Sequence, residues 1–228
     1  MRRGLRRIHI WLGWVVAIPF LVWVVTGALM VVTPFDKVRG NEMLAPPVPV
    51  ALTAAPVVPT FDGRAIRSLT LEQRAPGARW IIRYQDGGAA LADPATGQLL
   101  PAFTAADAEA EVRGRYQGEE TIAGTDRTSA EEPPIDLRRP LETWRVTMTD
   151  GTRFYVNAAS GEIVTHRTET WRFYDFLYGL HIFDVFARDN INNIWAQMFA
   201  WIGAVSVVLA LVLLPFTLRR RRRRARKD

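Results

Sequence analysis

Two long apolar segments, one near each end of the chain, constrain its fold more than any other feature. They cover residues 8–32 and 194–214, and each contains only two polar side chains. At ~1.5 Å per helical residue, both are long enough to cross a ~30 Å hydrocarbon core. The first is also longer than the apolar part of a signal peptide, and no clear A-x-A cleavage site follows it. We therefore predict two retained transmembrane helices, over residues 8–34 and 194–215.

Basic residues at both ends of the chain predict its orientation in the membrane. Residues 1–7 and 219–227 hold 12 of the 29 lysines and arginines, whereas residues 8–218 hold 17 basic and 22 acidic residues, a net charge of −5. The high pI of 10.3 thus comes from the tails and does not indicate nucleic-acid binding. Because basic tails stay in the cytoplasm, we predict cytoplasmic tails at 1–7 and 216–228. The region between the spans is then periplasmic, and the membrane is the bacterial inner membrane.

The residue inventory excludes several kinds of chemistry. The chain has no cysteine, so disulfides, thiolate metal sites and cysteine nucleophiles are excluded. It contains no phosphate-binding loop, dinucleotide fingerprint, H-E-x-x-H motif or nucleophile elbow. We assign no catalytic residue and no protein metal site, and expect no catalysis by this chain alone. The only histidines are His9, His166 and His181.

An internal repeat organises the region between the spans. Residues 79–100 (RWIIRYQDGGAALADPATGQLL) align without a gap to residues 143–164 (TWRVTMTDGTRFYVNAASGEIV) at an offset of 64. Alternating apolar residues predict strands, and the Asp-Gly pairs at 86–87 and 150–151 predict tight hairpin turns. A second turn before Gly97 or Gly161 leads to a third strand. Each copy is therefore predicted to form a small antiparallel meander.

The remaining segments have simpler patterns. Thr104 and Asp107 predict the start of a helix that reaches about Arg115, and the polar residues 117–134 predict a loop. Residues 41–60, rich in proline and alanine, predict a linker, and 61–170 are the predicted domain. The aromatic segment 171–187 predicts an amphipathic helix at the membrane surface. The expected fold class is an α+β membrane protein with two transmembrane helices flanking a domain of repeated antiparallel β-meanders with a helix.

The motifs together resemble those of a known family. The helix, hairpin and strand ending in a turn before Gly161-Glu162 resemble the PepSY domain. The first span resembles the pattern H-x-W-L-G…(L/V)-T-G-x-L of PepSY-associated transmembrane helices, and here reads His9-Ile-Trp-Leu-Gly13…Val25-Thr-Gly-Ala-Leu29. Leu180-His181 matches the family's L-H before the next span. The resemblance covers residues 5–35 and 79–215. The first repeat copy lacks a clear preceding helix and is expected to be a partial unit.

The resemblance also implies a cofactor. Larger members of the family resemble inner-membrane reductases of ferric siderophores, which hold b-type haem between histidines of several spans. His9 and His181 match haem-ligand positions, and histidine is a standard axial ligand. His9 lies at the inner end of its span and His181 is expected at the outer surface, roughly one bilayer core of ~30 Å away. One chain therefore cannot place both on one haem, and a bis-histidine site requires a homodimer or another membrane chain.

Three functions remain open at this point. The chain is a non-catalytic extracytoplasmic module that binds or regulates a partner, such as a periplasmic peptidase, since PepSY domains resemble inhibitory pro-regions of secreted peptidases. Alternatively, it is a haem-binding electron-transfer subunit linked to iron uptake, with a redox partner. As a third reading, it is a structural or assembly subunit of a larger membrane complex. The lipid bilayer is a partner in all three, and the simpler interpretation of His9 and His181 is as interfacial residues without a ligand.

Overall fold

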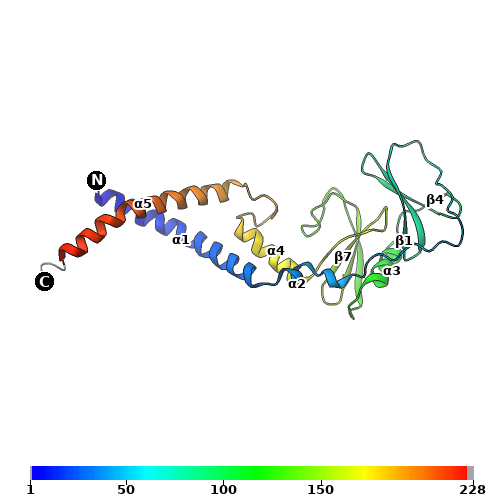
Figure 1. Cartoon of the computed structure of the whole chain (residues 1–228), viewed down its shortest axis with the longest axis horizontal. Coiled ribbons are helices and arrows are strands. Elements are labelled where there is room, and N and C mark those ends of the chain that lie inside the picture. Colours follow the sequence, from blue (N-terminus) through cyan, green and yellow to red (C-terminus); the bar gives the residue numbers. More distant parts are fainter. Residues whose placement is uncertain (1, 225–228) are drawn as a thin grey trace. The chain divides into compact units, whose positions relative to one another are not determined.

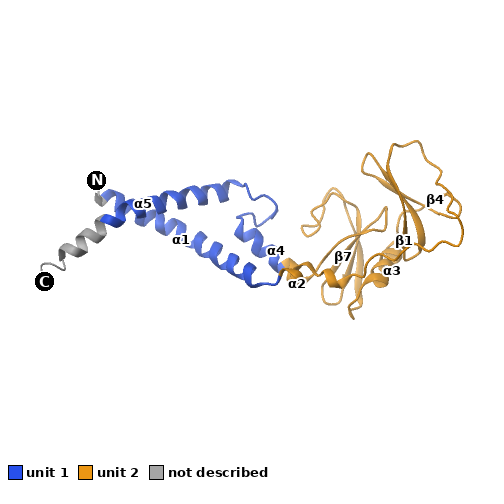
Figure 2. Cartoon of the chain, viewed as in Figure 1, with its two compact units in different colours: residues 1–34, 173–228 blue, residues 35–172 orange. Residues whose placement is uncertain are grey.

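The computed structural model describes residues 2–224 of the chain, with side chains for residues 4–215. Figure 1 shows the order of the elements, and Figure 2 shows two compact units. The first unit combines residues 1–34 with 173–228, and the second contains residues 35–172. The last part of the predicted C-terminal tail, 225–228, lies outside the described residues. Two apolar helices flanking a domain with two antiparallel sheets confirm the expected α+β class.

The first unit is built on the two long helices. Helix α1 covers Arg2–Val32 and α5 covers Ile194–Arg224. Within them, Gly4–Val32 and Ile194–Pro215 are long and apolar enough to cross a membrane, and almost none of either stretch is buried inside the protein. The shorter helix α4, Glu169–His181, belongs to this unit from Phe173 onward. A connection of residues 182–193 then leads into α5.

The second unit contains two four-stranded antiparallel sheets, each in sequence order. Short helices, α2 and η1, precede the sheets at Phe35–Arg39 and Asn41–Met43. The first sheet consists of β1 (Ile66–Arg74), β2 (Gly77–Tyr84), β3 (Ala89–Ala92) and β4 (Leu99–Leu100). The second consists of β5 (Ile122–Thr128), β6 (Thr143–Met148), β7 (Arg153–Asn157) and β8 (Ile163–Arg167). Helix α3 (Ala105–Arg115) connects the two sheets.

The hairpin turns of the two copies are alike at the level of single hydrogen bonds. Gly87 and Gly151 have φ values of 88° and 82°, in the left-handed region that glycine adopts without strain. In each turn the preceding aspartate accepts a hydrogen bond from the backbone N–H two residues later, at 2.8 Å for both Asp86 and Asp150. The predicted meanders are therefore confirmed, with matching turn geometry.

Each sheet also has a first strand that the gapless repeat did not predict. The predicted loop at 117–134 is wrong, because β5 lies within it. The registers show why β1 and β5 were missed. Ile66 pairs with Tyr84 and Ile122 pairs with Met148, so these strands align at an offset of 56, not 64. The β5–β6 connection, 129–142, is longer than the β1–β2 turn at 75–76, and this difference breaks the alignment.

Helix α3 begins as its sequence predicts. The Thr104 hydroxyl accepts from the backbone N–H of Asp107, and the Asp107 carboxylate accepts in return from the backbone N–H of Thr104. This reciprocal capping box satisfies two backbone donors at the helix start. Buried Ala108 and Val112 place one face of α3 in the main core. That core takes residues from both sheets: Ile81, Leu91, Val146, Met148, Phe154 and Val156.

The proline- and alanine-rich segment before β1 follows the surface of the domain. Near its start, Leu44 forms an antiparallel bridge with Tyr116. Near its end, the Val57 N–H donates to Pro94 O at 2.8 Å, and the Trp80 indole donates to Val57 O at 2.8 Å. The end of the segment therefore lies against the first sheet, beside the apolar residues of β2.

Candidate functional site

His181 ends helix α4 and lies against helix α1. Its ring stacks on the Trp23 ring, with centroids 5.0 Å apart and an interplanar angle of 18°. Its Nδ1 atom lies 3.1 Å from the Trp23 carbonyl oxygen and 3.2 Å from Thr26 Oγ1. The structure thus brings together the Thr-Gly and Leu-His parts of the sequence pattern, which are far apart in the chain.

These contacts fix which nitrogen of His181 carries a proton. The Thr26 hydroxyl lies 2.8 Å from Val22 O and donates to it, so Thr26 Oγ1 acts as an acceptor toward the imidazole. The Trp23 carbonyl can only accept. His181 Nδ1 must therefore be the donor, which leaves Nε2 outside these contacts. Histidines that ligate metals commonly donate their other N–H to a carbonyl in this way.

Gly27 gives the imidazole room beside α1. A Cβ atom at this position would lie 3.0 Å from His181 Cε1 and 3.5 Å from Nδ1. The first distance is tighter than ordinary contact, so a Cβ atom here would require the imidazole to shift by a few tenths of an ångström. Thr26 and Gly27 thus have separate physical roles, one as hydrogen-bond acceptor and one as space for the ring.

His9 lies elsewhere on α1. The helix between His9 and Thr26 spans about 25 Å at ~1.5 Å per residue, so His9 and His181 cannot share one ligand in one chain. The His9 Nδ1 atom is buried and has no hydrogen-bond partner among the described residues. Within those residues there is also no cluster of three or more histidine or carboxylate side chains suited to a metal. Whether His9 or His181 binds haem stays a prediction.

His166 has a packing role in the second unit. It lies on β8, its ring stacks on Phe154 with centroids 5.8 Å apart, and its Nε2 atom is 3.0 Å from Gly40 O. Because a carbonyl only accepts, Nε2 carries the proton. Burial lowers the pKa of His166, against smaller opposing effects from the Gly40 and Arg39 backbone. Its neutral ring therefore ties β8 to the segment that follows α2.

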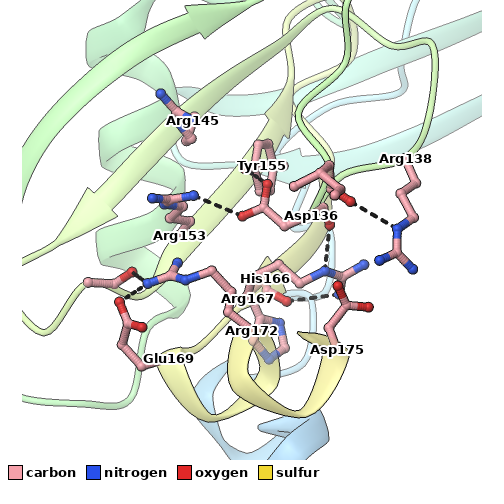
Figure 3. Close-up of polar contacts among 12 residues, drawn as sticks. Asp136, Arg138, Arg145, Arg153, Tyr155, His166, Arg167, Glu169, Arg172 and Asp175 are labelled. Carbon is pink, nitrogen blue, oxygen red and sulfur yellow. Dashed lines mark hydrogen bonds and ion pairs between the residues drawn. The ribbon is translucent and has the colours of Figure 1, made fainter. Parts of the chain in front are cut away.

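Sequence reasoning missed a buried polar network on the second sheet. Asp136 lies in the 129–142 connection, with its side chain 5% exposed. It accepts from the Tyr155 hydroxyl at 2.7 Å and from Arg153 Nη1 at 3.1 Å, and its backbone oxygen accepts from Arg167 Nε at 2.7 Å. Figure 3 shows Asp136 between these side chains. Burial, followed by the bond to Asp136, raises the pKa of Tyr155, which therefore remains a neutral donor.

This network reduces the repulsion between two like charges. Arg153 and Arg167 are directly opposite each other on β7 and β8, where like charges destabilise a sheet. The Asp136 carboxylate pairs with Arg153 and the Asp136 backbone oxygen accepts from Arg167, which reduces that repulsion and fits a structural role. The sequence carried one signal of it, since Asp136 is flanked by apolar Ile135 and Leu137 within the connection.

Comparison with known proteins identifies one relationship. A family model described as the PepSY-associated TM region matches residues 6–228, and so includes both spans and both sheets. No curated protein and no solved structure gives a significant match. The motifs around Thr26-Gly27 and His181 and the repeated sheets thus fall inside one family match.

Proposed function

The chain belongs to the PepSY-associated TM family, and on that premise we propose that its domain is a binding or regulatory module held outside the cytoplasm. Family membership and the two apolar helices make it a membrane-anchored PepSY-type protein. Our proposal adds that the two sheets within residues 35–172 present a surface to a partner protein. A peptidase in the periplasm is a partner of the expected kind.

Strand β5 is the observation that supports binding. It lies at the edge of the second sheet and pairs with β6 on one side. Its residues Ala123, Gly124, Asp126 and Arg127 are exposed. An edge strand offers backbone N–H and C=O groups to an extended segment of another protein. The charges of Asp126 and Arg127 oppose unselective strand pairing, so a fitting partner must match both the backbone edge and these side chains.

Site-specific photo-crosslinking in intact cells tests this proposal. A photoreactive residue at Ala123 on β5 is expected to form one discrete adduct with an extracytoplasmic protein. The same residue at Ala95, exposed in a turn of the first sheet, is the matched control and is expected to give none. Equal adduct patterns at both positions, or none at Ala123, would contradict binding through β5.

A second candidate function is a haem-binding electron-transfer subunit, and His181 is the observation that favours it. The donation from Nδ1 to Trp23 O fits the tautomer that an axial ligand needs. A bound b-type haem would supply one-electron redox chemistry. Thr26 and Trp23 would hold the imidazole, and Gly27 would set its distance from α1. Because one chain offers one histidine beside Thr26 of α1, the second axial ligand would come from another chain.

Absorption spectra of the detergent-purified protein, oxidised and then reduced with dithionite, test this candidate. We expect a b-type reduced spectrum that His181→Ala removes, and His9→Ala reports separately on the inner position. Gly27→Ala is expected to shift or weaken the spectrum by displacing the ring. Gly13→Ala is its matched control, because a Cβ there meets nothing within 4 Å. A colourless protein after expression with added haem would contradict a site built by this chain alone.

A further inference from the structure

The connection between α4 and α5, residues 182–193, has an unusual distribution of polar and apolar side chains. In a loop surrounded by water, charged side chains point outward and aromatic ones pack inward. Here Phe186 is 90% exposed and Ile191 is 60% exposed, while Arg188 has a side chain only 19% exposed. Part of this loop is therefore arranged for an apolar environment.

The charges close to these apolar residues are satisfied within the protein. Arg188 forms an ion pair with buried Asp175 of α4 at 3.0 Å, and its Nε donates to Val185 O at 2.9 Å. Asp184 accepts hydrogen bonds from the backbone N–H groups of Ala187, Asp189 and Asn190. Because these groups have internal partners, the loop can approach hydrocarbon without leaving them unpaired.

The same loop also has exposed polar residues. Asp189, Asn190 and Asn192 are exposed. Asn193 has a different role, since its Oδ1 accepts from the Ala196 N–H at 2.9 Å at the start of α5 and its side-chain nitrogen donates to Ile182 O at 2.8 Å. These bonds hold the loop against the ends of both helices. The exposed polar and apolar side chains thus belong to one hydrogen-bonded segment.

The exposed apolar residues continue onto the neighbouring helices. On α4, Phe173 and Phe176 are 57% and 41% exposed, and their spacing places them on one face. Phe183, in the loop, contacts Phe199 of α5 with ring centroids 4.8 Å apart. Because α5 is a candidate membrane span from Ile194 onward, this ring contact joins the loop to a helix that is expected to meet lipid.

We propose that residues 182–193 form an interfacial anchor, in which Phe186 and Ile191 enter the bilayer at its boundary with water and Asp189 and Asn190 remain in the aqueous phase. The occupant of the apolar side is the lipid of the membrane that the two spans cross. Trp195, 64% exposed in the first turn of α5, adds an aromatic residue of the kind found at this depth. The anchor would fix how deeply α4 and α5 sit in the membrane.

Because the chain has no cysteine, single nitroxide labels can test this anchor in the full chain in phospholipid vesicles. Labels are placed at Phe186→Cys and Ile191→Cys, with Asp189→Cys as the matched control in the same loop. Val207→Cys, in the second span, is the lipid reference, and Ala95→Cys, in the domain, is the water reference. Power-saturation EPR then compares collisions with oxygen, which concentrates in hydrocarbon, and with a neutral nickel chelate, which stays in water.

We expect the oxygen-to-nickel ratio at positions 186 and 191 to be several-fold higher than at 189 and closer to that at 207. A ratio at 186 equal to those at 189 and 95 would overturn the proposal, because the loop would then be surrounded by water. Low collision rates with both reagents at 186 would also overturn it, since protein would then cover the position. The Ile191 label keeps the test decisive if the Phe186 variant does not fold.

Discussion

The two repeat copies share a hydrogen-bond framework and differ in what covers it. Val57 and Phe103 occupy equivalent places. The Val57 N–H donates to Pro94 O at 2.8 Å, and the Phe103 N–H donates to Ala158 O at 2.8 Å. The Trp80 indole donates to Val57 O, and the Trp144 indole donates to Phe103 O. Val57 and Phe103 are therefore equivalent starting residues of the two units, and each lies before the first strand of its sheet.

The copies diverge in the connection that follows Val57 or Phe103. In the second copy it contains helix α3, which packs on Val146 and Phe154 in the main core. In the first copy it is an extended segment, and Arg64 lies 3.7 Å from the centroid of the Tyr84 ring. One face of this sheet framework can thus be covered either by a helix or by an extended segment without regular secondary structure.

The opposite faces differ as well. In the first copy, Ile81 and Leu91 are buried in the core shared by both sheets. Their equivalents in the second copy are Arg145, which pairs with Asp126 of β5, and Tyr155, which donates to Asp136 of the 129–142 connection. The first sheet is therefore apolar on two faces and the second on one. The two copies keep the same backbone pairing, and their different residues at alternate positions make one face of the second sheet polar although it is also buried.

Phe154→Ala should have the largest effect on stability. Phe154 is fully buried among residues of α3 and the second sheet, and its removal leaves a cavity that typically costs about 3–5 kcal/mol. Phe61→Ala, in the extended segment of the first copy, is the control because Phe61 is 46% exposed. Urea unfolding of the domain in detergent measures both, and equal losses would show that the helix-covered face is not the main core.

Asp136→Ala ranks second. It leaves the buried Tyr155 hydroxyl without its acceptor and Arg153 opposite Arg167 without a counter-ion, and loss of one partner of such a buried group costs about 3 kcal/mol. Asp86→Ala, which breaks an ion pair between side chains 43% and 59% exposed, should change stability far less. Thermal unfolding compares them. A small change for Asp136→Ala would mean that the network contributes little.

The matched tryptophan substitutions should have moderate and similar effects. Trp80→Phe and Trp144→Phe each remove one indole donor from the equivalent carbonyl oxygens of Val57 and Phe103. A hydrogen bond of this kind contributes about 1 kcal/mol net. If residues 57–64 are a true cover of the first sheet, chemical denaturation should show comparable losses for both. No loss for Trp80→Phe would indicate that the extended segment detaches readily.

The smallest expected effect is a pH dependence from His166. Its folded-state pKa is lowered, chiefly by burial, so the unfolded chain binds a proton first as the pH falls below ~6.5. Stability should therefore be full above ~6.5 and decline below it, until the folded-state pKa is reached. Unfolding measured across this range should show a flatter profile for His166→Gln. Identical profiles would exclude His166 as the source.

Periodicity and turn chemistry were sufficient to predict much of the fold. The apolar lengths predicted both long helices, the Asp-Gly turns and the turns before Gly97 and Gly161 predicted the meanders, and Thr104 with Asp107 predicted the start of α3. Strand β5 could not be predicted in this way, because IAGTDRT lacks apolar alternation and lies beyond a change in repeat offset. Its strand conformation depends on pairing with β6, which is a tertiary contact.

The candidate site was only partly predictable. The pattern named His181, Thr26 and Gly27 as separate motif positions, but only the structure shows that they meet, because the contact joins α4 to α1. The same holds for Asp136, whose partners lie on β7 and β8. Local sequence carries no information about such distant pairs. The haem, the partner and the periplasmic location of the domain remain predictions.

Cysteine accessibility in intact cells tests the central claim, an extracytoplasmic module, most directly. Ala95→Cys lies in an exposed turn of the first sheet, and Gly4→Cys lies in an exposed position near the N-terminus; the chain has no other cysteine. With a membrane-impermeant maleimide, we predict that position 95 is labelled in intact spheroplasts and position 4 only after permeabilisation. Labelling of position 95 only after permeabilisation would place the domain in the cytoplasm and contradict the account.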